Sequence, residues 1–186
     1  MNASVALILG GARSGKSRRA ITFAESASPR RVFLATAEAF DAEMADRISR
    51  HKNERDGTWV TVEAPRDLPS AIARTAGPDR VVVADCLTLW ASNLLLADAD
   101  MDAETGALDA AVAAAAGPLV LVSNEVGLGI VPNNALARRF RDVAGRINQT
   151  VAARAGLVLF VAAGLPLFLK RPADGPWAGA ASGGSP

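Results

Sequence analysis

The chain of 186 residues has a single cysteine, Cys86, and a single histidine, His51. One cysteine cannot form an intrachain disulfide, and without a Cys/His cluster neither a structural zinc site nor a multi-histidine metal site is expected. An excess of one charge sign is missing too, because 20 Lys and Arg stand against 19 Asp and Glu. A protein that bound nucleic acid by neutralising phosphates would be more basic, so we expect no nucleic-acid partner.

Long apolar segments are also missing. The uncharged run between Arg154 and Lys170 is too short for a membrane-spanning helix and is interrupted by Gly164 and Pro166. At the N-terminus, the apolar run Val5–Leu9 is too short for a signal peptide, and no basic segment precedes it. We therefore expect a cytoplasmic protein without a membrane span. The length suits one domain with a sizeable core.

Apolar runs alternate with helical patterns along the chain. Several runs are apolar without interruption, which is typical of strands buried on both faces of a sheet. This alternation predicts an α/β fold with a mostly parallel, doubly wound sheet. The expected strands are Val5–Gly10, Arg31–Ala35, Trp59–Glu63, Arg80–Asp85, Leu119–Ser123 and Leu157–Ala163, and the expected helices include Lys16–Ser26, Asp41–Arg55 and Ala135–Ala155.

The last residues differ from the rest in composition. Residues 171–186 are rich in Gly, Ala, Ser and Pro, which predicts a tail that lies outside the core. Trp177 is the residue of this segment that could dock on the domain. We therefore expect a domain over residues 1–170 and a low-complexity tail over residues 171–186.

The clearest motif joins an expected strand to an expected helix. The residues Gly10-Gly11-Ala12-Arg13-Ser14-Gly15-Lys16-Ser17 match the P-loop pattern in the strand-to-helix context that it requires. The glycines allow backbone N–H groups to turn toward phosphate oxygens, and the helix N-terminus adds a positive dipole end. Lys16 is expected to reach the β- and γ-phosphates of GTP or ATP, and Ser17 to ligate Mg²⁺. A chance glycine-rich turn is the alternative.

Asp85 ends the apolar run Val81–Ala84. The C-terminal end of a buried strand is where a P-loop fold places the carboxylate associated with its metal, so Asp85 is expected to act on Mg²⁺ or the nucleotide. The alternative is that Asp85 caps the helix that follows. Cys86 fits a small buried residue better than a nucleophile.

His51 falls within the expected helix Asp41–Arg55, on the same face as Met44 and Ile48. Arg47 and Arg55 lie four residues before and after it, and two nearby cations disfavour an imidazolium. A neutral imidazole beside phosphate-binding arginines could attack phosphorus. From spacing alone, a partly buried helix histidine without any chemistry is the favoured reading.

Several segments together resemble one family, the bifunctional adenosylcobinamide kinase / adenosylcobinamide-phosphate guanylyltransferases of cobalamin biosynthesis. The resemblance covers about Leu7 to Lys170, and its most specific block runs from Asn124 to Pro132. The blocks that carry it, in order, are Gly10–Ser17, Ala35-Thr36-Ala37, Asp41-x-Glu43-Met44, Arg47-Ile48-x-x-His51-x-x-x-Arg55, Trp59-x-Thr61-x-Glu63, Asp85-Cys86-Leu87-Thr88, Asn93-Leu94-Leu95, Asn124–Pro132, Arg138-x-Phe140-Arg141-Asp142-x-x-Gly145, Asn148-Gln149 and Gly164–Lys170.

The resemblance implies a fold, a set of contacts and an assembly. It implies a RecA-like P-loop fold, a homotrimer and a covalent guanylyl intermediate on His51. Beyond the P-loop, the nucleotide contacts that it implies are Ala35, Thr36, Ala37, Lys52, Asn53, Glu54, Arg55, Glu63 and Asp85. The residues after Lys170 depart from the pattern.

The resemblance also implies two successive reactions. The enzyme is expected to phosphorylate adenosylcobinamide with ATP or GTP, and then to pass GMP from GTP through His51 to adenosylcobinamide phosphate. Arg13 could stabilise the moving phosphoryl group or face solvent. Glu125 and the loop after it are expected to help form the active site. The glycines of that loop could also be explained by a need for positive φ at Gly127 or Gly129, and the two interpretations are compatible. Two other classes share the P-loop, a motor or switch GTPase or ATPase and a nucleotide-sensing module.

Overall fold

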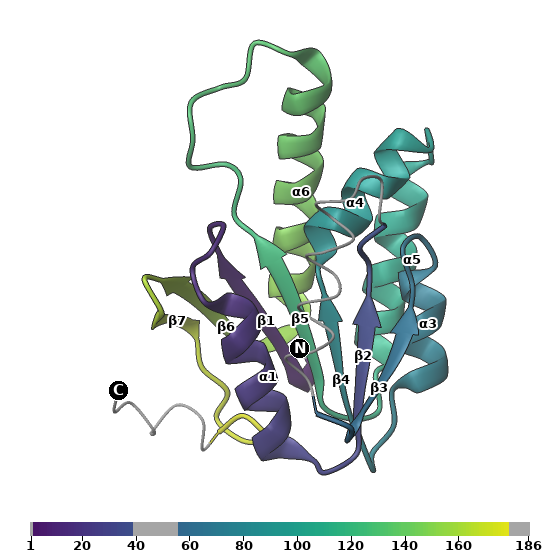
Figure 1. Ribbon diagram of the computed structural model, residues 1–186, viewed down its shortest axis with the longest axis vertical. Helices are drawn as coiled ribbons and strands as arrows, with labels where there is room; N and C mark the ends of the chain where they lie inside the picture. Colours follow the sequence, from purple (N-terminus) through teal and green to yellow (C-terminus); the bar gives the residue numbers. More distant parts are fainter. Residues whose placement is uncertain (1, 39–55, 179–186) are drawn as a thin grey trace.

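The computed structural model describes residues 2–38 and 56–178, and the element labels are those of Figure 1. Within these residues seven strands form one sheet, in the order β3-β2-β4-β5-β1-β6-β7. All neighbouring pairs are parallel except β6 and β7. The elements are β1 (Asn2–Gly10), α1 (Lys16–Ala27), β2 (Arg31–Ala35), β3 (Trp59–Glu63), α3 (Leu68–Thr75), β4 (Val81–Asp85), α4 (Leu87–Leu96), α5 (Met101–Ala114), β5 (Leu119–Asn124), α6 (Ala135–Arg154), β6 (Ala155–Ala162) and β7 (Leu165–Lys170).

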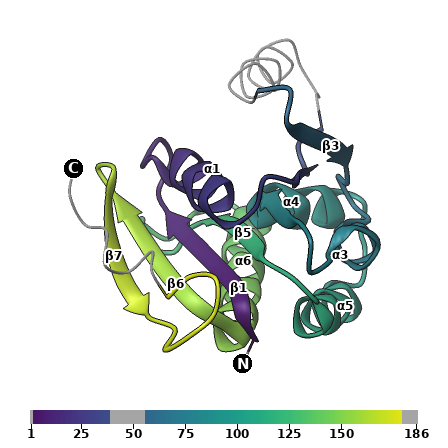
Figure 2. The same cartoon turned by 90° about the horizontal axis from the view of Figure 1, so that it is seen from below.

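Two hydrophobic cores lie on opposite faces of the sheet, which confirms the predicted α/β architecture. On one face the sheet packs against Ala20, Phe23 and Ala24 of α1. On the other face it packs against α3, α4, α5 and α6, whose buried side chains include Leu68, Trp90, Leu108 and Ile147. Figure 2 shows α1 apart from these four helices. The central strands β1, β4 and β5 are apolar almost throughout because both of their faces are covered.

The expected strands are all present, with ends that differ by at most three residues, and the predicted helix Asp41–Arg55 lies outside the described residues. Helix α4 entered the predictions only as the helix that Asp85 could cap, because seven of its ten residues are buried and leave no polar face to reveal a helical period. Strand β7 was missed because it lies at the sheet edge and contains Pro166, which is tolerated only in such a position. None of the described helices is long and apolar enough to cross a membrane.

The segment after β7 returns to the domain. Trp177 is fully buried, and its ring lies 6.2 Å from the ring of Phe23 on α1. Gly175, with φ of 88°, packs against Ala3 at the start of β1. The possibility that Trp177 docks on the domain is therefore confirmed, whereas residues 171–176 are exposed or half-buried. A single large aromatic side chain outweighs the low hydrophobicity of its neighbours, because it buries a large apolar area.

Replacing Trp177 by alanine should destabilise the domain by about 3–5 kcal/mol, since the change leaves a cavity against Phe23. Urea unfolding of the full-length variant measures this loss. Trp177→Phe is the matched control, because it keeps a ring against Phe23 and should lose clearly less. A loss below about 1 kcal/mol in Trp177→Ala would mean that this segment does not dock in solution.

Candidate active site

The predicted nucleotide contacts that the structure describes meet at one edge of the sheet. Ala35 at the end of β2 pairs with both Glu63 on β3 and Asp85 on β4. Gly10, at the end of β1, pairs with Asn124 at the end of β5. Parallel strands bring their carboxyl ends to the same edge, so residues between 28 and 114 positions apart lie in neighbouring strands.

The P-loop forms a tight turn between β1 and α1. Gly15 has a φ of 95°, a left-handed conformation that glycine adopts without strain, and Lys16 begins α1 directly after it. The Lys16 ammonium donates to the Gly11 carbonyl at 3.1 Å, so the largely buried side chain folds back over the loop. At Gly10 a Cβ atom would lie 2.5 Å from both the Val161 carbonyl oxygen and the Ser14 hydroxyl. The loop therefore packs against β6 with no space for a side chain at Gly10.

The β6–β7 hairpin supports the loop from behind. The Gly164 amide donates to the Ser14 carbonyl at 2.8 Å, and the Gly164 Cα lies 3.3 Å from where a Cβ on Gly15 would be. Ala163 and Gly164 have φ values of 51° and 79°, which are typical of a two-residue hairpin turn. This support was not recognised in the sequence, where Gly164 appeared only as an interruption of an apolar run and as the start of a family block.

The remaining loop residues differ in exposure. Ala12 and Arg13 are exposed, and Arg13 has a φ of 57°. Ser14 is buried and Ser17 is half-buried. Arg13 therefore has access to a ligand from the solvent side of the loop, which leaves both of its predicted alternatives open.

Ser17 and Asp85 offer the donors that Mg²⁺ prefers, a hydroxyl and a carboxylate. Ser17 lies in the first turn of α1, and Asp85 is half-buried at the end of β4. Among the described residues no group of three or more His, Cys, Asp or Glu side chains could hold a metal by itself. Magnesium bound to a nucleotide needs no such cage, because phosphates and water complete its shell. The donor set fits a nucleotide-linked ion.

A buried hydrogen-bond network lies beneath the carboxyl ends of these strands. The Thr36 hydroxyl accepts from the Cys86 amide at 2.6 Å and donates to the Cys86 carbonyl at 2.8 Å. The Thr36 amide donates to the Asp85 carbonyl at 3.3 Å, and its carbonyl accepts from Asn93. Thr36 is fully buried. All of its polar groups are thus engaged within the protein, which makes a supporting role a better fit than the direct nucleotide contact expected for it.

The same network continues to β5. The Thr88 hydroxyl lies 3.2 Å from the Cys86 sulfur and accepts from the Asn124 side-chain amide at 2.9 Å. Asn148 of α6 donates to the Asn124 carbonyl at 3.3 Å. Burial, followed by the charge of the neighbouring Asp85, raises the pKa of the Cys86 thiol. A thiol that stays protonated is no nucleophile, in agreement with the expectation of a small buried residue.

The loop after β5 begins beside the P-loop. The Glu125 amide donates to the Gly10 carbonyl at 3.1 Å, and its carboxylate accepts from the Gly127 amide at 2.6 Å. Among the described glycines, Gly15, Gly164 and Gly175 have positive φ. The interpretation that Gly127 or Gly129 requires a left-handed backbone is therefore wrong. The loop carries exposed apolar side chains at Leu128, Ile130 and Val131.

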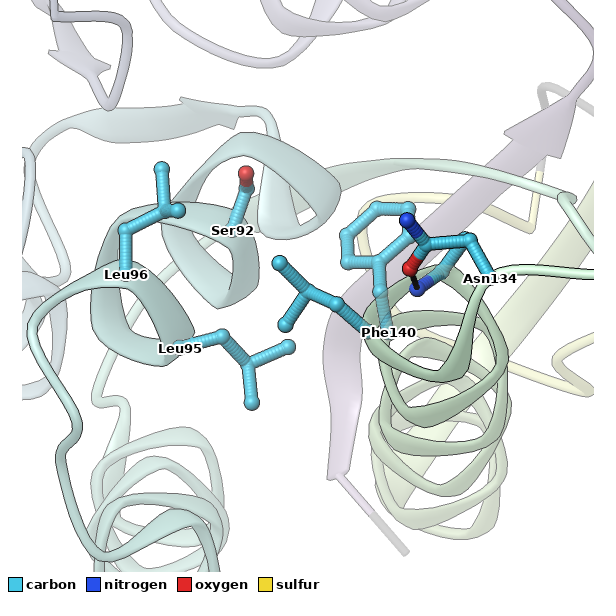
Figure 3. A pocket seen from close by; sticks show the side chains of 7 residues that line it. Ser92, Leu95, Leu96, Asn134 and Phe140 are labelled. Atoms are coloured by element: carbon cyan, nitrogen blue, oxygen red, sulfur yellow. Dashed lines mark hydrogen bonds between the residues drawn. The ribbon is translucent and has the colours of Figure 1, made fainter.

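An apolar hollow of about 330 Å³ lies between α4 and α6 (Figure 3). It is lined by Ser92, Leu95, Leu96, Asn134, Leu136, Ala137 and Phe140, none of which is a predicted site residue. Asn134 caps α6 there by accepting from the Ala137 amide. The hollow is therefore separate from the residues expected to bind the nucleotide.

Five of the predicted site residues lie outside the described residues. They are His51, the expected nucleophile, and Lys52, Asn53, Glu54 and Arg55, the expected nucleotide contacts beside it. Their roles stay predictions.

Comparison with known proteins identifies close relatives. The family described as cobinamide kinase / cobinamide phosphate guanyltransferase matches residues 6–169. The bifunctional adenosylcobalamin biosynthesis protein CobP of Pseudomonas aeruginosa is 45% identical over 166 residues, which cover 88% of this chain and 96% of the relative. The proteins named CobU from Salmonella typhimurium and Escherichia coli are each 41% identical over 179 residues, with 88% of this chain and 98% of the relative covered.

Two adjacent glycines offer a matched test of how the P-loop, the expected phosphate cradle, packs against β6. Gly10→Ala should destabilise the protein by about 1–3 kcal/mol and weaken binding of a fluorescent GTP analogue, because its Cβ meets a backbone carbonyl that cannot move freely. Gly11→Ala has no atom within 4 Å of its new Cβ and should stay within about 1 kcal/mol of the wild type. Urea unfolding without nucleotide compares the two. Equal stabilities would contradict the close approach of the loop to β6.

Proposed function

The chain belongs to the cobinamide kinase / cobinamide phosphate guanyltransferase family, and we propose how one site performs the two reactions. The protein is an enzyme of adenosylcobalamin biosynthesis with kinase and guanylyltransferase activities, and its nucleotide substrates are GTP and ATP. A motor or switch and a nucleotide sensor share the P-loop, but family membership supports neither.

One observation carries the proposed site. The P-loop and the strand ends with Ala35, Glu63 and Asp85 share one edge of the sheet, in fixed register. We assign the triphosphate to residues 10–17 and the rest of the nucleotide to the strand ends and to residues 52–55. Backbone N–H groups of the loop, the start of α1 and the Lys16 ammonium then face the phosphates.

In the first reaction, the hydroxyl oxygen of the aminopropanol arm of adenosylcobinamide attacks the γ-phosphorus of ATP or GTP. A P–O bond forms, the bond to the β,γ-bridging oxygen breaks, and the nucleoside diphosphate leaves as the hydroxyl loses its proton. Lys16 and the loop amides stabilise the charge on the moving group, and exposed Arg13 can approach it from the solvent side.

Ser17 and Asp85 would hold magnesium, which would supply positive charge against the phosphates during transfer. Loss of both reactions on chelation with EDTA tests this assignment. The Asp85 backbone is fixed by the hydrogen bond from Thr36, so its carboxylate projects from a rigid strand end.

In the second reaction, an imidazole nitrogen of His51 attacks the α-phosphorus of GTP. A P–N bond forms, the bond to the α,β-bridging oxygen breaks, and pyrophosphate leaves. A phosphate oxygen of adenosylcobinamide phosphate then attacks the same phosphorus and displaces His51, giving adenosylcobinamide-GDP. Two displacements through a covalent intermediate divide one difficult transfer into easier steps.

We also propose that the enzyme acts as a homotrimer in the cytoplasm, where nucleoside triphosphates are abundant. The exposed side chains of Leu128 and Ile130, 81% and 98% accessible, provide apolar surface that a neighbouring subunit could cover. Sedimentation equilibrium at micromolar concentration tests the trimer, and a clean monomer contradicts it. Activity that sediments with membranes would contradict the location.

Replacing His51 by alanine should separate the two activities. The variant should form no covalent adduct with GTP labelled at the α-phosphate and transfer no GMP, since the chain has no other histidine. Phosphorylation of adenosylcobinamide should remain measurable, because the first reaction needs no imidazole. Lys16→Ala is the contrasting variant and should depress both reactions, because both use the phosphate cradle.

The chemistry of the wild-type adduct gives an independent check. A phosphoramidate on His51 should be labile in acid and stable in base, unlike an acyl phosphate on Glu63 or Asp85. Covalent GMP on His51→Ala, or an acid-stable wild-type adduct, would show that another residue is the nucleophile. Release of γ-phosphate without any adduct would instead favour a switch or motor.

A further inference from the structure

We propose that Asn93 is a positioning residue for the nucleotide, because its side-chain amide holds the ends of β2 and β3 in place. Asn93 lies on α4, on the face of the sheet that α3, α4, α5 and α6 cover, and is 3% exposed. It is too deeply buried to touch a ligand. It acts instead on the two strand ends that carry the expected nucleotide contacts, so the inference rests on the proposed site.

The Asn93 amide makes two hydrogen bonds to two different strand ends. It donates to the Thr36 carbonyl at 2.8 Å, directly after β2, and to the Pro65 carbonyl at 2.9 Å, two residues after β3. A side-chain amide has two donor hydrogens, and these two acceptors can use both. One planar group therefore fixes the separation of the two backbones.

The bridge lies just beyond the point where the backbone ladder between β2 and β3 ends. The last hydrogen bond in the ladder direction runs from the Ala64 amide to the Ala35 carbonyl at 2.8 Å. Thr36 follows Ala35 and Pro65 follows Ala64, so both carbonyls that Asn93 holds lie one residue beyond this bond. Asn93 supplies donors from outside the sheet at the position where β2 and β3 separate.

The bridge extends to β4 through Thr36. The Thr36 amide bonds to the Asp85 carbonyl, and its hydroxyl bonds to both backbone groups of Cys86. A shift of Thr36 would therefore move the backbone beside Asp85 as well as Ala35. Asn93 acts on three strand ends although it contacts two of them.

Trp90 offers a matched control on the same helix. It lies one turn before Asn93, is fully buried, and donates from its indole nitrogen to the Arg66 carbonyl at 2.8 Å. Trp90→Phe thus removes a buried hydrogen bond to the segment after β3 without removing any bond to Thr36. If nucleotide binding depended only on general stability, both variants would bind more weakly. If it depends on the spacing of the strand ends, only the Asn93 variant would bind more weakly.

The experiment compares full-length wild type, Asn93→Ala and Trp90→Phe. Binding of a fluorescent GTP analogue is measured at a fixed interval below each protein's own melting temperature, followed by KM and kcat for GTP. Asn93→Ala should raise Kd and KM about tenfold, the effect expected from leaving buried carbonyls without a donor, with kcat changed less than about threefold. Trp90→Phe should lower the melting temperature while Kd stays within about twofold.

Three results would overturn the inference. They are an unchanged Kd in Asn93→Ala, an equal rise in Trp90→Phe, or a fall in kcat without a change in KM. Should Asn93→Ala fail to fold, Asn93→Ser is measured in its place, since its hydroxyl keeps one donor and should give a smaller rise in Kd; wild-type affinity in that variant would also contradict the inference. If the wild-type protein transferred no GMP to adenosylcobinamide phosphate, that result would instead refute the proposed function, independently of the comparison between variants.

Discussion

The lack of space for a side chain at Gly10 is the constraint on which the phosphate cradle depends. A Cβ there would lie 2.5 Å from the Val161 carbonyl of β6, so only glycine lets β1 end in contact with its neighbour. The close approach brings the β6–β7 hairpin within reach of the loop, where Gly164 bonds to Ser14. The loop is thus held by a second backbone as well as by its own turn. An anion site made of backbone amides needs such rigidity, because its donors must already point at the phosphates before binding.

The other strand ends are fixed by side chains that lie behind the site. Thr36, Thr88 and Asn93 form hydrogen bonds with backbone groups at the ends of β2, β3, β4 and β5. Unpaired backbone groups beneath a binding site would cost free energy and would leave the strand ends free to move. Since these polar groups are buried and mutually satisfied, the edge can present Ala35, Glu63 and Asp85 as one surface. The apolar core of α4 in turn holds Thr88 and Asn93 in register with the sheet.

The sequence predicted the parts of this arrangement that are local. The P-loop is a contiguous motif, and uninterrupted apolar runs such as Val81–Ala84 marked the buried strands. Asp85 could be placed at the sheet edge because it ends such a run. The supports were not predictable, because they join residues far apart in the chain: Gly164 lies 150 positions from Ser14, and Asn93 lies 57 from Thr36. Docking of Trp177 could be raised only as a possibility, because composition describes a segment whereas burial is decided by one side chain.

A single cradle imposes a geometric condition on the two proposed reactions. The first attack takes place at the γ-phosphorus, next to Lys16, whereas the second takes place at the α-phosphorus, two phosphates nearer the nucleoside. In-line displacement requires each nucleophile to approach opposite its leaving group, and both leaving groups contain the β-phosphate. The acceptor hydroxyl must therefore enter from the open end of the loop, and the imidazole from the nucleoside side. With the triphosphate at residues 10–17 and the nucleoside toward Ala35 and Glu63, as proposed, the nucleotide would lie in a single direction along the carboxyl ends of the strands. With the nucleotide held in that direction, two nucleophiles can use one cradle without competing for the same space.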